Sequence, residues 1–251
     1  MTYGRFAYLY DELMRDVPYH EWLTFIKRQA ETYGIAGKKL LDLACGTGEL
    51  TIQLADEGYD VTGVDLSGDM LAVAKEKADK RGHSLFFAEQ DMSELEGLGQ
   101  FDIIGIFCDS LNYLQTEREV VQTFERVLHH VKPEGLFLFD VHSVYKINTL
   151  FIDQTYAYNG EDVSYIWQCF EGEYPNSVEH ELTFFHLDTH TNQYNRYDEL
   201  HLQRTYAIEQ YEKWLSMTGF ELLDVTADFL HSNPNAESER IFFTARKRKT
   251  E

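Results

Sequence analysis

The segment from Leu40 to Glu49, which reads LLDLACGTGE, constrains the fold of this chain more than any other feature. An apolar run with strand character leads into a glycine turn, and a stretch with helical spacing follows. Gly46 and Gly48 have no β-carbon, so the backbone can take positive φ there and a ligand can approach the amide groups at the start of the helix. In a doubly wound α/β domain, the turn after the first strand is the preferred cradle for a ligand. The segment therefore predicts a ligand site beyond the carboxyl ends of a parallel sheet.

Asp65 ends the next apolar stretch, about 20 residues after Gly46. A carboxylate at that point can accept hydrogen bonds from both hydroxyls of a ribose. The alternative is an acidic residue that only favours the start of the helix expected after Ser67. A nicotinamide dinucleotide and S-adenosylmethionine both present a ribose at this position. Thr51 stands where a dinucleotide fingerprint, GxGxxG, has its third glycine, so the turn favours S-adenosylmethionine.

Apolar stretches alternate with helical periodicity over the first 142 residues. The expected strands are Lys39 to Ala44, Asp60 to Leu66, Ser84 to Ala88, Phe101 to Cys108 and Leu136 to Val141, and the expected helices begin near Asp16, Glu49, Ser67 and Thr116. Strands that are apolar on both faces and alternate with helices are typical of a parallel sheet covered on both sides. We therefore expect an α/β fold with a doubly wound, mostly parallel seven-stranded sheet.

The pattern changes after His142. The stretch from Tyr156 to Leu202 is dense in Tyr, Phe, Thr and His and is broken by turn signals, which predicts an inserted antiparallel β-meander of three or four strands. Helical spacing returns at Ala207 to Met217, and the stretches Phe220 to Phe229 and Arg240 to Lys247 can pair as a final antiparallel hairpin. We expect one α/β domain, residues 1–142 and 207–251, with a lid subdomain, residues 143–206, inserted into it.

Composition disfavours several classes of protein. The formal net charge of -21 repels a phosphate backbone, so nucleic acid is an unfavourable partner, and the basic run from Arg246 to Lys249 is more simply a solvated tail. No apolar run approaches the roughly 18 residues of a membrane span, and the N-terminus lacks the order of a signal peptide. The three cysteines are widely separated and have no ligand spacing. We expect a cytoplasmic protein with free thiols, no membrane association and no metal site.

Several segments in combination resemble the class I S-adenosylmethionine-dependent methyltransferases. They read LLDLACGTG, VTGVDLS, FAEQDM, FDIIGIFCDSLNY and VKPEGLFLFDVHS and cover nearly the whole α/β domain. The resemblance implies S-adenosylmethionine as the cofactor, with its ribose on Asp65. It also implies that the methionyl end lies against Asp42, Ala44, Cys45, Gly46 and Gly48, the adenosine against Leu66, Met70, Asp91 and Met92, and the transferring methyl near Cys108 and Asp109. The N-terminal YGRFAYLYDELM resembles the family's cap segment, in which Tyr10, or secondly Tyr3, closes over the cofactor.

Simpler structural alternatives stand beside these assignments. The N-terminal aromatic residues can pack a helix onto the sheet, Asp91 can cap a loop, and Met70 and Met92 can fill the core. Ala44 departs from the family pattern, which most often has a glycine there. We expect φ to stay negative at Ala44, where alanine is tolerated.

Methyl transfer requires alignment of the nucleophile with the methyl group, and a proton acceptor when the nucleophile carries a proton. The candidates at the expected strand ends are Asn112, Tyr113 and His142. In the last strand of the meander, His201 and Arg204 are further candidates, and Arg204 can bind a substrate carboxylate. Pairing of Arg204 with an acidic residue, and a partly exposed His201, are the simpler expectations.

The sequence as a whole predicts a methyltransferase that acts, as a monomer or homodimer, on a small molecule enclosed under the meander. The motif Asn-Pro-Pro-Tyr of some DNA and protein amino-group methyltransferases is absent after the fourth strand. The negative charge favours a neutral or cationic substrate. Two alternatives stay open, namely an RNA or protein acceptor, and a nucleotide-binding regulatory module without turnover.

Overall fold

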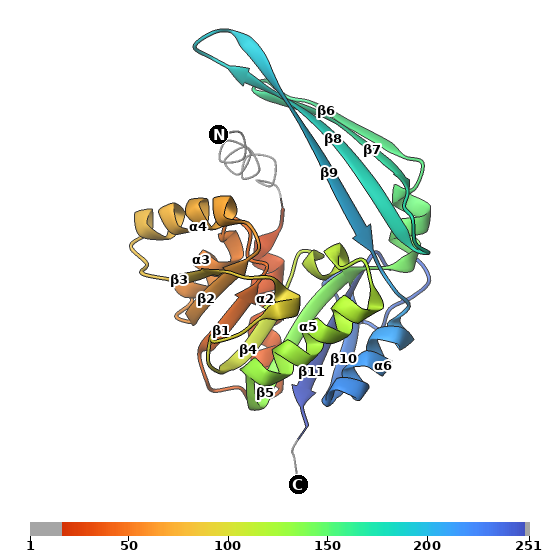
Figure 1. The fold of residues 1–251 in the computed structure, drawn as a ribbon. Coiled ribbons are helices and arrows are strands. Elements are labelled where there is room, and N and C mark those ends of the chain that lie inside the picture. The colour runs from red at the N-terminus through yellow and green to blue at the C-terminus, as the bar shows by residue number, and fades with distance from the viewer. Residues whose placement is uncertain (1–16, 249–251) are drawn as a thin grey trace.

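Two β-sheets organise the protein, whose computed structural model describes residues 17–248 (Figure 1). A seven-stranded sheet lies between helices, and a separate four-stranded antiparallel sheet extends away from it. This arrangement confirms the predicted fold class, a doubly wound and mostly parallel α/β sheet with an antiparallel meander. Tyr3 and Tyr10 lie outside the described residues.

The seven-stranded sheet has the order β10-β11-β5-β4-β1-β2-β3. Its strands are β1 (Lys39–Leu43), β2 (Asp60–Asp65), β3 (Phe86–Glu89), β4 (Phe101–Ile106), β5 (Val131–His142), β10 (Phe220–Ala227) and β11 (Arg240–Lys247). The pairs from β3 through β5 are parallel, and β11 is antiparallel to both of its neighbours. The chain winds from β1 toward β3 on one side and toward β5 on the other. The switch point, where ligands of such sheets bind, therefore lies at the carboxyl ends of β1 and β4.

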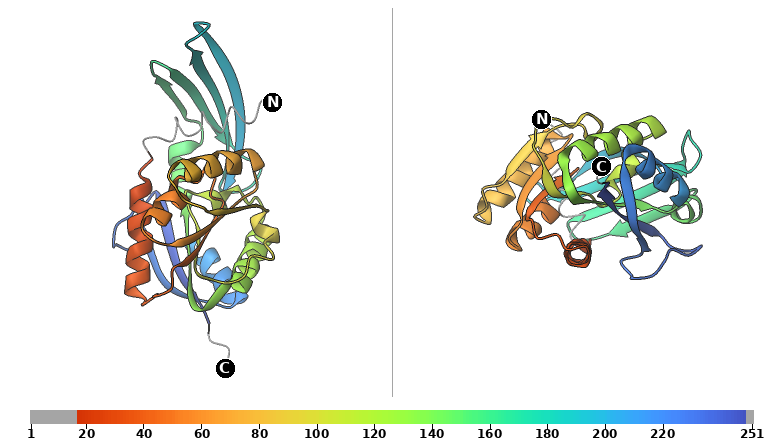
Figure 2. Two further views of the ribbon diagram at one scale, coloured as in Figure 1. Left: turned by 90° about the vertical axis from the view of Figure 1, so that its left-hand side faces the viewer. Right: turned by 90° about the horizontal axis from the view of Figure 1, so that it is seen from below.

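Helices cover both faces of this sheet. They are α2 (Tyr19–Thr32), α3 (Glu49–Asp56), α4 (Gly68–Lys80), α5 (Glu117–His130) and α6 (Ile208–Thr218), with the short helical segments η1 (Met92–Glu94), η2 (Ser110–Tyr113) and η3 (Lys146–Phe151). The view from below shows α2 and α5 on opposite faces of the sheet (Figure 2). Ser67 caps α4 by accepting a hydrogen bond from the Met70 amide, as predicted, and a capping box of Thr116 and Glu119 opens α5.

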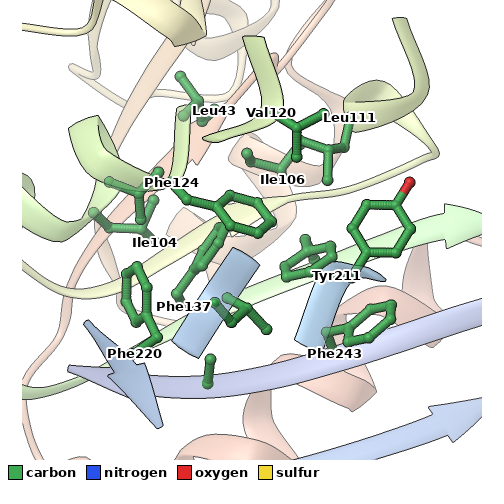
Figure 3. Close-up of a cluster of buried hydrophobic side chains, with 14 of the residues drawn as sticks. Leu43, Ile104, Ile106, Leu111, Val120, Phe124, Phe137, Tyr211, Phe220 and Phe243 are labelled. Atoms are coloured by element: carbon green, nitrogen blue, oxygen red, sulfur yellow. The ribbon is translucent and has the colours of Figure 1, made fainter. Parts of the chain in front are cut away.

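The core consists of two main hydrophobic clusters, one on each face of the seven-stranded sheet. Alternate residues of β5 divide between them, with Phe137 and Phe139 on the α5 and α6 face and Leu136 and Leu138 on the α2 face. Figure 3 shows Phe137, Phe124, Tyr211 and Phe243 gathered in the first cluster. Because both faces are buried, the central strands are apolar throughout, which is the pattern that predicted a parallel sheet.

The second sheet contains β6 (Thr155–Asn159), β7 (Val163–Glu171), β8 (Ser177–Asp188) and β9 (Gln193–Arg204), each antiparallel to the next. Its four strands match the predicted meander and run two residues beyond Leu202. Side chains alternate between its two faces. The face that carries His201 is called the inner face below, and it consists of Tyr156, Tyr158, Val163, Tyr165, Trp167, Cys169, Glu171, Val178, His180, Leu182, Phe184, His186, Asp188, Gln193, Asn195, Tyr197, Glu199, His201 and Gln203.

Several strand boundaries differ from the predicted ones, and at two of them positive φ angles accompany the difference. Strand β5 begins at Val131 rather than Leu136 and passes through an irregularity with Glu134 at φ 64°. Strand β10 ends at Ala227 rather than Phe229, because residues 228 and 229 take positive φ. Within residues 17–248, no helix has both the length and the apolar character needed to cross a membrane.

Candidate functional site

A cavity of about 410 Å³ opens at the carboxyl ends of β1, β2, β3 and β4, at the predicted switch point. It is lined by Leu43, Ala44, Gly46, Asp65, Leu66, Ser67, Met70, Gln90, Asp91, Met92, Ser110, Tyr113, Leu114, Glu119 and His201. Nine of the predicted site residues are among them, including Tyr113 and His201 from the catalytic candidates. The other predicted residues that the structure describes, Asp42, Cys45, Gly48, Cys108, Asp109, Asn112, His142 and Arg204, do not line this cavity.

The glycine turn adopts the left-handed backbone conformation at Ala44, Gly46 and Gly48. Ala44 lies at φ 65°, so the expectation of a negative φ is wrong. The chain must reverse between β1 and α3 while the Cys45 amide still donates to Val64, and this geometry requires the left-handed conformation. Alanine there costs about 1 kcal/mol relative to glycine, so the cavity wall contains a strained residue.

The two glycines of the turn have different roles. At Gly46 (φ 55°) no atom lies within 4 Å of the position that a β-carbon would occupy, so this residue leaves the cavity wall open. At Gly48 (φ 75°) a β-carbon would lie 2.9 Å from the β-carbon of Ala74 in α4. Gly48 therefore allows α3 and α4 to pack closely, which differs from the prediction that both glycines make room for a ligand.

Asp65 joins the glycine turn to the start of α4. Its carboxylate accepts hydrogen bonds from the Gly46 amide at 2.7 Å and the Ser67 amide at 2.9 Å. Burial raises the pKa of Asp65, and these backbone hydrogen bonds partly oppose the change. The structure thus places a carboxylate on the cavity wall at the end of β2, within a shell of backbone donors.

The predicted adenosine residues all contribute to the cavity wall. Leu66 is exposed, and Met70 packs against the cluster of Val163 and Phe184 in the second sheet. Asp91 also caps η1, because its carboxylate accepts hydrogen bonds from the amide and hydroxyl of Ser93. The simpler structural roles of these residues are therefore present, although each of the predicted residues also contributes to the cavity wall.

Asp42 lies beneath the cavity, fully enclosed by protein. Its carboxylate accepts a hydrogen bond of 2.5 Å from the Thr51 hydroxyl. Burial raises the pKa of Asp42 from 3.8 to about 6, and the charge of Asp65 adds to the increase. Asp42 is therefore largely ionised at neutral pH at a cost in folding free energy.

The Asp42→Asn variant is expected to be about 3 kcal/mol more stable than the parent protein at pH 7.5. The folded state holds the Asp42 proton more tightly than the unfolded chain does, so this group lowers stability as the pH rises from about 4 to about 6. The amide removes that penalty and still accepts the hydrogen bond from Thr51. Urea unfolding at pH 7.5 and pH 4 measures both proteins, and the gain should nearly vanish at pH 4. The same gain at both pH values would contradict this account.

Asp109 belongs to a buried polar network behind the cavity. Cys108 and Asp109 both take φ 54°, and their amides donate to the buried carboxylate of Asp140 at 3.0 Å. The guanidinium of Arg240 pairs with both Asp109 and Asp140. Burial alone would raise the pKa of Asp109. The contacts with His142 and Arg240 outweigh this effect and hold the pKa well below its usual range. The predicted place of Cys108 and Asp109 beside the transferring methyl therefore stays a prediction.

Tyr113 and His201 form a pair at the boundary between the cavity and the second sheet. The Tyr113 hydroxyl and the His201 Nδ1 are 3.1 Å apart, and the two rings meet edge to face. Burial lowers the pKa of His201, so the imidazole is neutral at physiological pH. Burial also raises the pKa of Tyr113, as do the charges of nearby carboxylates, so its hydroxyl keeps its proton. A neutral imidazole hydrogen-bonded to a phenol can accept a proton.

The remaining catalytic candidates occupy structural positions. The Arg204 guanidinium packs over the rings of Tyr174 and Tyr206, at 4.8 and 4.6 Å from their centroids, and donates to the Gln115 carbonyl. It therefore lies away from the cavity, and aromatic stacking replaces the expected acidic partner. His142 is buried, with Nε2 3.3 Å from the Asp109 carboxylate.

Sequence reasoning missed a polar connection between the two sheets. The Gln203 amide donates to Asp109 at 2.8 Å, and its carbonyl lies 3.1 Å from Nε2 of His180. Trp167 donates to Nδ1 of the same imidazole, so Nε2 carries the proton. Burial lowers the pKa of His180 to about 4 and keeps it neutral. The alternation of polar and apolar residues in β8 and β9 was the one sequence signal that indicated this inner-face network.

The chain is similar to known proteins over its whole length. Residues 40–135 match the family model described as "Methyltransferase domain". A protein of Geobacillus sp. (strain WCH70) whose name assigns it to the methyltransferases is 51% identical over 98% of this chain and 100% of its own length. The crystal structure of a S-adenosylmethionine-dependent methyltransferase from Clostridium acetobutylicum ATCC 824 is 32% identical, covers 98% of this chain and 99% of that chain, and superposes with a TM-score of 0.89. The glycine/sarcosine N-methyltransferase of Halorhodospira halochloris is 27% identical over 83% of this chain and 75% of its own length.

Proposed function

Because this chain belongs to the class I S-adenosylmethionine-dependent methyltransferases, we propose that it methylates a small molecule bound between the cavity and the inner face of the second sheet. The protein is an enzyme, and S-adenosylmethionine is its cofactor. The observation that carries the proposal is the position of His201, which extends from the second sheet to the cavity wall beside Tyr113.

The residues of the cavity fit the cofactor. The open face of Gly46 leaves space against the backbone, and Asp65 offers carboxylate oxygens in reach of the same wall. In the proposal Asp65 holds the ribose hydroxyls, Leu66, Met70 and Met92 surround the adenine, and Asp91 accepts a hydrogen bond from it. Asp42 lies below the turn, where its negative charge favours the cationic methionyl end.

Bound S-adenosylmethionine supplies an electrophilic methyl group on a positively charged sulfur. Tyr113 and His201 act on the acceptor. The nucleophilic atom of the acceptor bonds to the methyl carbon as the carbon–sulfur bond breaks, and the electron pair of the broken bond stays on sulfur. The Tyr113 hydroxyl takes the acceptor's proton while its own proton passes to Nδ1 of His201. The inner face of the second sheet orients the acceptor and excludes water.

A small acceptor is supported by the enclosure and by the chemistry of relatives. The second sheet reaches the cavity at two places, through His201 and through the packing of Met70 against Val163 and Phe184. The glycine/sarcosine N-methyltransferase among the relatives acts on small molecules by its name. The net charge of -21 opposes an RNA acceptor.

The three cysteines are free thiols, which supports a reducing compartment. We propose that the protein acts in the cytoplasm.

A methyl-transfer assay with radiolabelled S-adenosylmethionine tests the proposed function. Extract of the source cell is divided into small metabolites, RNA and protein, and each fraction is incubated with the enzyme. We expect label in the small-metabolite fraction. Label confined to RNA or to protein would overturn the proposal, and silence in every fraction would favour the regulatory alternative.

Tyr113→Phe tests the proposed proton transfer, because it removes the hydroxyl and keeps the ring. We expect kcat to fall at least about tenfold with little change in the affinity for S-adenosylmethionine. The matched control is Tyr194→Phe, which removes an exposed hydroxyl on the opposite face of the second sheet. An unchanged kcat in Tyr113→Phe would exclude Tyr113 from proton transfer.

A further inference from the structure

Strand β9 carries a carboxylate over the space between the two sheets. Its inner-face residues pair across the sheet as Tyr197 with Phe184, Glu199 with Leu182, and His201 with His180. His201 lines the cavity, and Tyr197 belongs to the cluster against which Met70 packs. Glu199 lies between these two positions on the same face, so it borders the region assigned to the acceptor.

Glu199 has no compensating cation within residues 17–248. The structure gives its carboxylate neither an ion pair nor a hydrogen bond, although the side chain is half-buried. Burial raises the pKa of Glu199, and its charge contributes to the raised pKa of Tyr113, which sets the two groups near each other. A half-buried carboxylate without a cation has lost part of its hydration, and a bound cationic ligand would compensate that loss.

The surroundings of Glu199 contain an excess of negative charge. No lysine or arginine is among the described inner-face residues, and none lines the described cavity wall. Asp65, Asp91 and Glu119 contribute carboxyl groups to that wall, and the facing imidazole of His201 is held neutral. The arginines of β9, Arg196 and Arg204, belong to the opposite face of the sheet. This environment attracts a cation and repels an acceptor with a free carboxylate.

We propose that the acceptor is an amine that binds as an ammonium ion on Glu199, an inference that rests on the proposed function. The ammonium proton passes to the Tyr113 oxygen as the Tyr113 proton moves to Nδ1 of His201, which leaves a neutral nitrogen to attack the methyl carbon. The nitrogen–carbon bond forms and the sulfur–carbon bond breaks. Glu199, two residues from His201 on the same face, stabilises the imidazolium until it loses its proton to water. Glu199 is thus a specificity-determining residue.

Ion-exchange fractionation distinguishes this inference from the proposed function. The small metabolites are separated on cation- and anion-exchange resins before incubation with enzyme and radiolabelled S-adenosylmethionine. We expect the active acceptor to be retained by the cation exchanger. An active acceptor in the neutral or anionic fraction would overturn the inference while the small-molecule function stands, and label only in macromolecules would overturn both.

Glu199→Gln tests the role of the carboxylate on the cationic fraction. We expect the KM for the acceptor to rise about tenfold, the affinity for S-adenosylmethionine to stay unchanged, and the melting temperature to stay equal or rise, because an uncompensated charge is removed. Glu199→Asp should recover part of the KM loss. The control is Glu181→Gln, an exposed carboxylate on the opposite face of β8. An unchanged KM, or a loss explained by a lower melting temperature, would overturn the proposal.

Discussion

The Asp65→Ala variant is expected to bind S-adenosylmethionine about 100-fold more weakly than the parent protein. Asp65 ends β2 on the cavity wall, and two backbone amides already orient its carboxylate. In the proposed complex the two ribose hydroxyls donate to this carboxylate, and hydrogen bonds to a charged group are worth about 1.5–3 kcal/mol each. The expected loss is close to the value of one such bond, because water replaces part of the interaction in the variant.

Titration calorimetry measures this loss and also tests the choice of cofactor. The parent protein should bind S-adenosylmethionine and S-adenosylhomocysteine and should bind NAD far more weakly. The control is Asp69→Ala, which removes an equal charge from the exposed first turn of α4. Since Asp65 also holds the amides of Gly46 and Ser67, thermal unfolding of Asp65→Ala must show an intact fold. Full affinity in an intact Asp65→Ala protein would exclude the ribose assignment.

The sequence was sufficient for those features that depend on neighbouring residues in the chain. Buried strands such as β5 are apolar on both faces, and helix caps such as Ser67 accept a local amide, so the pattern predicted the sheet and its helices. The left-handed conformation of Ala44 was not predictable in this way. Its φ is set by the reversal between β1 and α3, and by the pairing of the turn with β2, which a residue type alone does not reveal.

The residues of the candidate site show the same difference between local features, which the sequence predicted, and long-range contacts, which it did not. Asp65 and Gly46 follow directly from the strand-turn-helix pattern, whereas the environment of Asp109 depends on residues more than 90 positions away. A cation from β11 and a side-chain amide from β9 bind the carboxylate oxygens of Asp109. No spacing in the sequence predicts these partners. For the same reason Arg204, a reasonable ligand for a substrate carboxylate, lies instead between two tyrosine rings.

One arginine holds together the centre of this long-range network. Arg240 pairs with Asp109 at 2.8 Å and with Asp140, and its guanidinium lies 5.0 Å from the ring of Trp22 in α2. The Trp22 indole donates to Asp140 at 2.7 Å. Asp140 is completely buried and Asp109 largely so, and the negative charges of these carboxylates raise the pKa of Arg240 against the opposing effect of burial. Arg240 is therefore the cation that pairs with both buried carboxylates.

Arg240→Met should reduce the free energy of unfolding by about 3–5 kcal/mol at pH 7.5, because it leaves both carboxylates buried without a cation. Urea unfolding followed by circular dichroism measures the loss. The control is Arg196→Met, whose partner Asp198 is exposed, and it should cost less than about 1 kcal/mol. A loss of less than about 1 kcal/mol would mean that the ion pairs of Arg240 with Asp109 and Asp140 contribute little to the stability of the fold.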